Sequence, residues 1–148
     1  MLPPTKLALL LHLLVEIPAS LSFLLAPHAQ LPGASAEARL ILRNLGGLLA
    51  ATNLIVLVIL LSNPAEAVSA TAAAAAETYR LTAWLCLCLG TYHVWPIHRA
   101  WVRMKWSLSS SHKKEEKKVL GGPAVHFMVH VLCLTALLGA GLVGVLDG

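Results

Sequence analysis

Long blocks of apolar residues, separated by short polar stretches, dominate this sequence. Four of these blocks hold about twenty residues each, which is enough for a helix to cross a hydrocarbon core of about 30 Å. The third block is the least regular, because Glu77 and Arg80 lie near its start. The pattern predicts a single all-α domain, a four-helix transmembrane bundle, with spans at about residues 7–26, 40–62, 77–96 and 123–146.

The first block needs a separate decision, because an apolar N-terminal stretch can be a secretory signal sequence. The apolar region of such signals has about 7–15 residues, and the block at residues 7–26 is longer. It also contains Glu16 and Pro18, which interrupt the uniform composition of a cleaved signal. We therefore expect a retained first span.

The composition agrees with a membrane protein and argues against an ordinary soluble domain. Apolar residues make up 57% of the chain and charged residues 12%, against about 45–50% and about 25% in globular proteins. Too few polar side chains are present to cover the surface of a soluble fold. Cys86, Cys88 and Cys133 all fall inside apolar blocks, and we interpret them as buried small residues.

Basic residues are divided unequally between the two sides that four crossings create. Nine lie on the side of the first and third loops, and two, Lys6 and Arg80, lie on the other. The positive-inside rule therefore places loops one and three, including a basic loop at residues 99–120, in the cytoplasm or in the matrix of a mitochondrion. Both termini are then lumenal or external. We expect an integral protein of the endoplasmic reticulum or another endomembrane.

The same basic side predicts membrane lipids as partners of the chain. Arg99, Arg103 and Lys105 follow the third block, and basic side chains at this position attract anionic lipid headgroups. Topology alone also explains these charges, so both interpretations stay open. We expect no nucleic acid as a partner.

Polar residues inside the blocks are the candidates for chemistry, because an ionised side chain at the bilayer centre is costly. Glu16 lies in the middle of the first block, with His12 and Ser20 one helical turn away on the same face. In the second block, small and polar residues form a stripe made of Arg43, Gly46, Ala50 and Asn53. Asn53 is suited to a hydrogen bond across a helix contact.

Histidines mark the third and fourth blocks. In the third block, one helical face carries Thr82, Cys86 and His93; in the fourth, one stripe carries His126, His130 and Cys133. Each block thus has one polar or small face, and we expect these faces to turn inward while Leu, Val and Ile face lipid. On this basis an interior pocket is predicted, lined by Glu16, Asn53, His93 and His130.

Three interpretations of these groups remain open, and the first is a structural polar network. The second is an acid/base site for isomerisation or cyclisation of a lipid or terpenoid, with Glu16 and either His130 or His93 as catalytic residues. The other residues expected to contact a ligand are His12, Asn53, Thr82 and His126. The third is a metal or haem site on His93, His126 and His130, for which no H-E-x-x-H motif or fixed Cys/His spacing is present. We predict no metal and no cofactor.

Three short motifs carry a resemblance to a known family. They lie at residues 43–47, 92–100 and 121–126 and read Arg-Asn-Leu-Gly-Gly, Tyr-His-Val-Trp-Pro-Ile-His-Arg-Ala and Gly-Gly-Pro-Ala-Val-His. At these motifs the chain resembles small uncharacterised four-helix integral membrane proteins of filamentous fungi. The resemblance covers nearly the whole chain and implies the four-helix architecture, but it implies no activity.

The function we expect is that of a small polytopic endomembrane protein with an interior polar cavity. This cavity engages a lipid-like ligand, or the protein stabilises a larger membrane assembly. The alternative is a cofactor-independent membrane enzyme that uses Glu16 with His130 or His93. Small-residue helix faces also favour a homo-oligomer or a partner membrane subunit.

Overall fold

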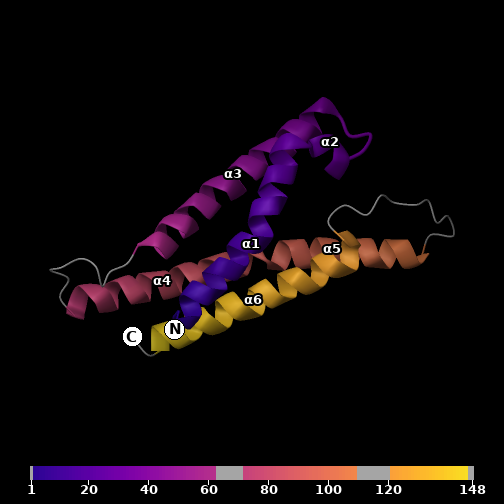
Figure 1. Cartoon of the computed structure of the whole chain (residues 1–148). Coiled ribbons are helices and arrows are strands. Elements are labelled where there is room, and N and C mark those ends of the chain that lie inside the picture. The colour runs from indigo at the N-terminus through magenta and orange to yellow at the C-terminus, as the bar shows by residue number, and fades with distance from the viewer. Residues whose placement is uncertain (1, 63–71, 110–120, 147–148) are drawn as a thin grey trace. The chain divides into compact units, whose positions relative to one another are not determined.

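The computed structural model describes residues 2–62, 72–109 and 121–146. Within these ranges every regular element is a helix and no strand is present, so the all-α prediction is confirmed. The helices are α1 (Pro4–Leu25), α2 (Pro27–Gln30), α3 (Ala36–Leu61), α4 (Ala72–Tyr92), α5 (Val94–Ser109) and α6 (Gly122–Leu146) (Figure 1).

Three of the described helices are long and apolar enough to cross a membrane. They are α1, α3 and α6. α4 has 21 residues but is not among them, because Glu77, Arg80 and other polar residues make it less apolar. Three of the four predicted spans therefore correspond to helices that are long and apolar enough to cross a membrane.

The chain divides into two compact units, residues 1–78 and residues 79–148. The first unit contains α1, α2 and α3, and the second contains most of α4 together with α5 and α6. Each unit is built around helices that run antiparallel and in close contact, and each has its own buried polar side chains.

In the first unit, α1 and α3 pack against each other as an antiparallel pair. At one end, the Lys6 ammonium donates hydrogen bonds to the carbonyl oxygens of Leu60 and Ser62, at 3.4 and 3.1 Å. At the other end, a Cβ added to Gly46 would lie 2.9 Å from the Cβ of Phe23. Because the helices approach this closely, glycine is required at position 46 and the register is fixed at both ends.

The short helix α2 closes the loop end of this pair. Its Pro27 is buried, and the side-chain amide of Gln30 donates a hydrogen bond to the Ser22 hydroxyl on α1. α3 begins after Ser35, whose hydroxyl caps the helix by accepting a hydrogen bond from the Ala38 N–H at 3.2 Å. The connection between the first two predicted spans is therefore partly helical and tied to α1.

In the second unit, α6 runs alongside α4 and α5 (Figure 1). A Cβ added to Gly141 would lie 2.9 Å from the carbonyl oxygen of Ala83, so the backbones of α4 and α6 nearly touch there. Further along, a Cβ on Gly90 would lie 2.8 Å from a methyl group of Leu138. These contacts set an antiparallel register that α5 continues along the first part of α6.

A one-residue break at His93 separates α4 from α5. The third span was expected to end near Pro96, but α5 runs on to Ser109, so residues 99–109 of the predicted basic loop are helical. Pro96 is tolerated because it lies in the first turn of α5, where backbone N–H groups have no acceptor within the helix. The rest of that loop, residues 110–120, lies outside the described residues.

The helices bury polar side chains together with apolar ones and expose many large apolar side chains. Large apolar side chains are exposed along α1, α3 and α6, and Leu14, Leu48 and Leu132 are each more than half exposed. Among the residues whose burial is described, the buried polar ones are Thr5, His12, Glu16, Ser20, Asn53, Thr82, His93 and His130. Helices in lipid show this arrangement, because polar groups there turn away from the hydrocarbon.

The structure corrects one predicted stripe. On α3 the buried residues repeat at intervals of three and four and are Leu42, Gly46, Leu49, Asn53 and Val56. Gly46 and Asn53 belong to the buried face, whereas Arg43 is exposed and Ala50 is half-buried. Arg43 lies about 100° around the helix from Leu42, so it cannot share the face that Leu42 and Gly46 define.

Candidate functional site

Two buried histidines of the second unit meet where α4 ends and α6 passes. Nδ1 of His93 lies 2.7 Å from Nδ1 of His130, which is a hydrogen-bond distance, and the ring centroids are 5.0 Å apart. His93 is 0% exposed and His130 is 2% exposed. The backbone holds His93 from both sides, because its N–H donates to Gly90 at 3.1 Å and its carbonyl accepts from Ile97 at 3.2 Å.

The hydrogen bond between these rings requires complementary proton positions. One Nδ1 must carry the proton and donate it, while the other Nδ1 must be unprotonated and accept. The two neutral rings are therefore opposite tautomers, or the pair holds one additional proton and is singly charged. In either state the pair can give a proton to a bound molecule or take one from it.

His126 extends this pair toward the start of α6. It lies one turn before His130, and the two ring centroids are 4.3 Å apart in an edge-to-face arrangement of 69°. Nε2 of His126 lies 3.3 Å from Nη2 of Arg99 on α5. Because a guanidinium group only donates hydrogen bonds, Nε2 is the acceptor and the ring proton of His126 lies on Nδ1. We call His93, His126 and His130 the three-histidine cluster.

The surroundings of the three-histidine cluster are positively charged. No acidic residue occurs in the described part of this unit, residues 79–109 and 121–146, and its charged side chains are those of Arg80, Arg99, Arg103 and Lys105. Imidazole nitrogens are good ligands for transition metals, so a cluster of this composition could hold one. The positive charge of Arg99, Arg103 and Lys105 favours a neutral or anionic polar group near this cluster.

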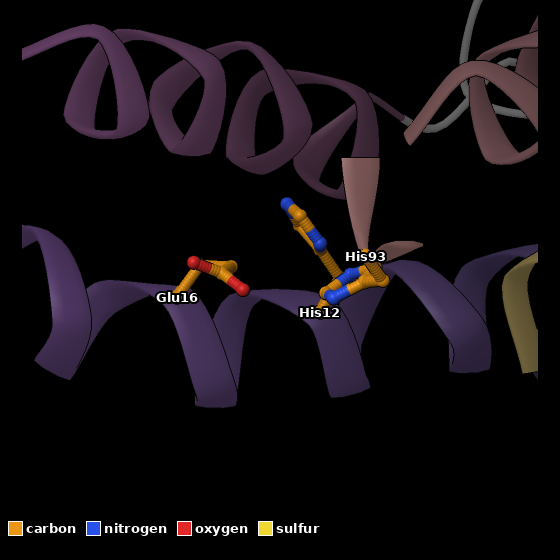
Figure 2. Close-up of side chains that lie close together, drawn as sticks. All are labelled: His12, Glu16 and His93. Atoms are coloured by element: carbon orange, nitrogen blue, oxygen red, sulfur yellow. The ribbon is translucent and has the colours of Figure 1, made fainter. Parts of the chain in front are cut away.

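The buried polar face of α1 is the counterpart in the first unit. His12 and Glu16 lie one turn apart and point to the same side of the helix (Figure 2). Glu16 is 0% exposed. One turn further, the Ser20 hydroxyl donates a hydrogen bond to the carbonyl oxygen of Ile17 at 2.9 Å. An ionisable group buried this deeply in an apolar helix is costly, which favours a functional reason for its presence.

Asn53 on α3 is the polar residue of the first unit with the least satisfied side chain. It is 5% exposed, and neither its amide oxygen nor its amide nitrogen has a hydrogen-bond partner among the described residues. The register set by Lys6 at one end and Gly46 at the other brings Glu16 opposite Asn53. A buried amide without partners costs about 1–3 kcal/mol, so Asn53 is available to a molecule that supplies both a donor and an acceptor.

The predicted site residues therefore divide between the two units. His93, His126 and His130 come together, and Thr82 is buried on α4 of the same unit. The remaining interior candidates belong to the first unit and are His12, Glu16 and Asn53. Of the residues predicted to contact lipid headgroups, Arg99 forms a hydrogen bond with His126. This contact was not predicted, because the sequence did not indicate that the helix continues past Pro96 alongside α6.

Lys105 and Trp101 form a further contact on α5. The Lys105 ammonium lies 5.2 Å from the centroid of the Trp101 ring, and this ring lies 6.1 Å from that of Phe127 on α6. A cation over an aromatic face at an exposed site contributes about 0.5–1 kcal/mol. Part of the positive charge of α5 is therefore held against aromatic surface.

A partly open cavity at the loop end of the first unit was not expected from the sequence. Its volume is about 430 Å³, and its lining residues are Pro27, His28, Ala36, Arg39, Leu40 and Arg43. The spacing of Arg39 and Arg43 is the signal that could have indicated it, because residues four apart share one side of a helix. These basic residues were instead interpreted as determinants of membrane topology.

Comparisons with known proteins identify no relative from which a function could be inferred. No protein-family model, no curated protein and no solved structure matches this chain. The resemblance to fungal membrane proteins therefore remains a prediction, and the roles of the three-histidine cluster and of Asn53 follow only from their chemistry.

Proposed function

We propose that this chain is a polytopic integral membrane protein that crosses the membrane four times and binds a lipid-like molecule through its buried polar groups. The membrane assignment rests on the length and apolar composition of α1, α3 and α6. The binding assignment rests on the polar side chains that these apolar helices bury.

The packing of the second unit supports a fourth crossing, made by α4 and α5 together. Ala83 lies level with Gly141 toward one end of α6, and Arg99 lies level with His126 toward the other. α4 and α5 together pack along α6 from Gly141 to His126, so they cross the membrane if α6 crosses it. The sequence between Arg80 and Arg99 also contains no Asp, Glu, Lys or Arg.

The observation that carries the ligand proposal is the burial of ionisable groups within apolar helices. His93 and His130 in the second unit and His12 and Glu16 in the first are all almost fully buried. Such residues are expensive in a membrane and mark sites of binding or proton transfer. A ligand that reaches them through apolar surroundings must itself be largely apolar, with one or two polar groups, as lipids and terpenoids are.

Orientation and location are part of the same proposal. The excess of basic residues favours a cytoplasmic position for the side that carries Arg39, Arg99 and Arg103, with both termini in the lumen of an endomembrane such as the endoplasmic reticulum. Arg99, Arg103 and Lys105 would then contact lipid headgroups. Membership of the fungal four-helix group fits this arrangement.

The test of this proposal uses the full chain expressed in cells. We expect it to stay with membranes after alkaline carbonate washing and to dissolve in detergent; release by carbonate would contradict the membrane assignment. Apolar molecules that copurify are then identified by mass spectrometry. We expect His130→Leu to lose a molecule that His98→Leu keeps, because His98 is exposed on α5. An unchanged profile in His130→Leu would contradict the ligand assignment.

A second candidate function, acid/base catalysis on a lipid or terpenoid, is favoured by the hydrogen bond between His93 and His130. In an isomerisation, one imidazolium gives a proton to one carbon of a double bond and a neutral imidazole removes a proton from a neighbouring carbon, so that no proton is gained or lost. Glu16, the fully buried carboxyl group of α1, is the other candidate proton donor. Glu16→Gln should abolish turnover while leaving folding intact, and retained turnover would exclude a catalytic role for this carboxyl group.

Assembly with a second copy or another membrane subunit is the alternative to ligand binding. Gly47 and Ala51 are exposed one turn apart on α3, and a Cβ at Gly47 or Gly139 would meet nothing within 4 Å. Exposed small residues of this kind let another helix approach closely in a membrane. Crosslinking in native membranes should recover a defined partner, and recovery of the monomer alone would contradict this alternative.

A further inference from the structure

The cavity between α2 and the start of α3 has the residue types of an anion site. Its volume of about 430 Å³ falls within the range of about 300–1,000 Å³ for small-molecule pockets. Arg39 and Arg43 line it from successive turns of α3, and His28 lines it from α2. None of its lining residues is acidic.

The two arginines have no charge partner in the part of the chain that the structure describes. Neither guanidinium group forms a hydrogen bond or ion pair there. Glu37, the acidic residue nearest to them in sequence, interacts with Ser35 and with its own backbone N–H. Arg99 in the second unit differs, because it is bonded to His126. No acidic group among the described residues therefore compensates the positive charge at this cavity.

Apolar surface adjoins this charge. Pro27, Ala36 and Leu40 form the rest of the wall. The hydrogen bond from Gln30 to Ser22 ties α2 to α1, so the wall formed by Pro27 is held in place. A site with two guanidinium groups beside aliphatic carbon suits a molecule that carries an anion and an apolar portion together.

The depth of the cavity matches the headgroup layer of a membrane. α3 has 26 residues, which is about 39 Å of helix, against a hydrocarbon core of about 30 Å. Its first turns therefore extend out of the core, and Arg39 lies there. Arg43 lies one turn deeper, within the reach of a snorkelling side chain.

We propose that this cavity binds the phosphate group of an amphiphilic molecule, either a phospholipid headgroup or a soluble phosphate ester. Arg39 and Arg43 supply planar pairs of N–H donors, which match phosphate oxygens, and His28 supplies a further donor. The site is separate from the buried polar groups proposed to bind a lipid-like molecule. It depends on the proposed function only for its place at the membrane surface.

The experiment measures lipid binding by the purified full chain in detergent, with native mass spectrometry as the readout. The probes are phosphatidic acid and diacylglycerol, which share their acyl chains and differ in the phosphate. We expect phosphatidic acid to bind well and diacylglycerol poorly. Arg43→Gln should weaken binding of phosphatidic acid roughly fivefold, since one basic side chain contributes about that factor at a membrane surface. Arg39→Gln/Arg43→Gln should weaken it further.

The control variant is Arg80→Gln, which removes the same charge from an exposed helical residue outside the cavity. We expect it to bind phosphatidic acid as the wild type does. Arg43→Lys, which keeps the charge and loses the planar pair of donors, should lie between the wild type and Arg43→Gln. Equal losses in Arg80→Gln and Arg43→Gln, or equal binding of diacylglycerol and phosphatidic acid, would overturn the proposal.

Competition with inorganic phosphate and with glycerol 3-phosphate identifies the source of the phosphate. Displacement of phosphatidic acid by these soluble compounds assigns the cavity to a soluble phosphate ester, and resistance to displacement assigns it to a lipid headgroup. Carbonate washing of the same variants separates this proposal from the membrane assignment. If Arg43→Gln stays in the membrane after washing and still binds phosphatidic acid as the wild type does, the cavity site is disproved. The membrane assignment is then unaffected.

Discussion

The two units bury polar side chains to similar degrees but satisfy them in different ways. In the second unit, His93 is bonded to His130 and Arg99 is bonded to His126, so the three-histidine cluster is held by its own chain. In the first unit, Asn53 is equally inaccessible yet has no hydrogen-bond partner among the described residues. A satisfied polar group can stabilise a fold by itself, whereas an unsatisfied one is retained at a cost. The comparison therefore points to different roles for the two units.

The largest effects are expected where helices touch. In Gly141→Ala the new Cβ meets the Ala83 carbonyl oxygen at 2.9 Å, and in Gly46→Ala it meets α1 at a similar distance. We expect each change to cost about 1–3 kcal/mol of the free energy of unfolding, because backbone atoms cannot move aside cheaply. Thermal unfolding in detergent measures the loss. Gly47→Ala and Gly139→Ala are the controls, since they meet no atom within 4 Å; comparable losses in these controls would disprove the close approach.

Breaking the histidine pair should have the next largest effect. His130→Leu leaves His93 buried without the hydrogen bond that now satisfies its Nδ1, at an expected cost of about 1–3 kcal/mol. The double variant His93→Leu/His130→Leu should recover part of that loss, because both polar groups are then removed. A double-mutant cycle on unfolding gives the coupling between the rings, and additive losses would show that they do not interact.

Asn53→Leu should behave in the opposite way and so sharpen the comparison. Its side chain has no hydrogen bond to lose, so we expect stability to stay the same or to rise by about 1 kcal/mol. Retention of a copurifying apolar molecule should fall at the same time, because the amide is the group offered to it. A loss of stability as large as that of His130→Leu would show that Asn53 is hydrogen-bonded within the folded chain.

The smallest effect concerns the end of α3. Lys6→Met removes the hydrogen bonds to Leu60 and Ser62, which lie where helix carbonyl groups lack intrahelical partners. We expect a loss of about 0.3–1 kcal/mol in the free energy of unfolding, as is usual for a cation at a helix C-terminus. The control is Lys105→Met, which removes the same charge from an exposed residue of α5 in the second unit. It should leave the thermal stability of α1 and α3 unchanged.

The sequence was sufficient for features that repeat along a helix. Runs of apolar residues predicted α1, α3 and α6, and periodicity placed Glu16, Asn53 and His130 on faces that the structure buries. Such predictions succeed because the spacing of residues on a helix is fixed by its pitch, whatever the helix packs against.

The sequence was insufficient wherever two segments had to be aligned. Pro96 predicted the end of a helix, yet it lies in the first turn of α5. Its missing N–H is tolerated there because the chain breaks at His93, three residues earlier. The bond between Arg99 and His126 depends on the register of α5 against α6, which neither segment encodes alone. The cavity around Arg39 depends in the same way on the fold-back of α2.

The alignment of α4 and α5 against α6 also limits how this sequence can change in length. Deleting one residue between Gly90 and Arg99 would turn everything beyond it by about 100° and shift it by about 1.5 Å. With Gly90 kept against Leu138, either His93 would lose His130 or Arg99 would lose His126. In an alignment of related proteins, the segment from Gly90 to Arg99 should therefore tolerate substitutions but contain no insertions or deletions.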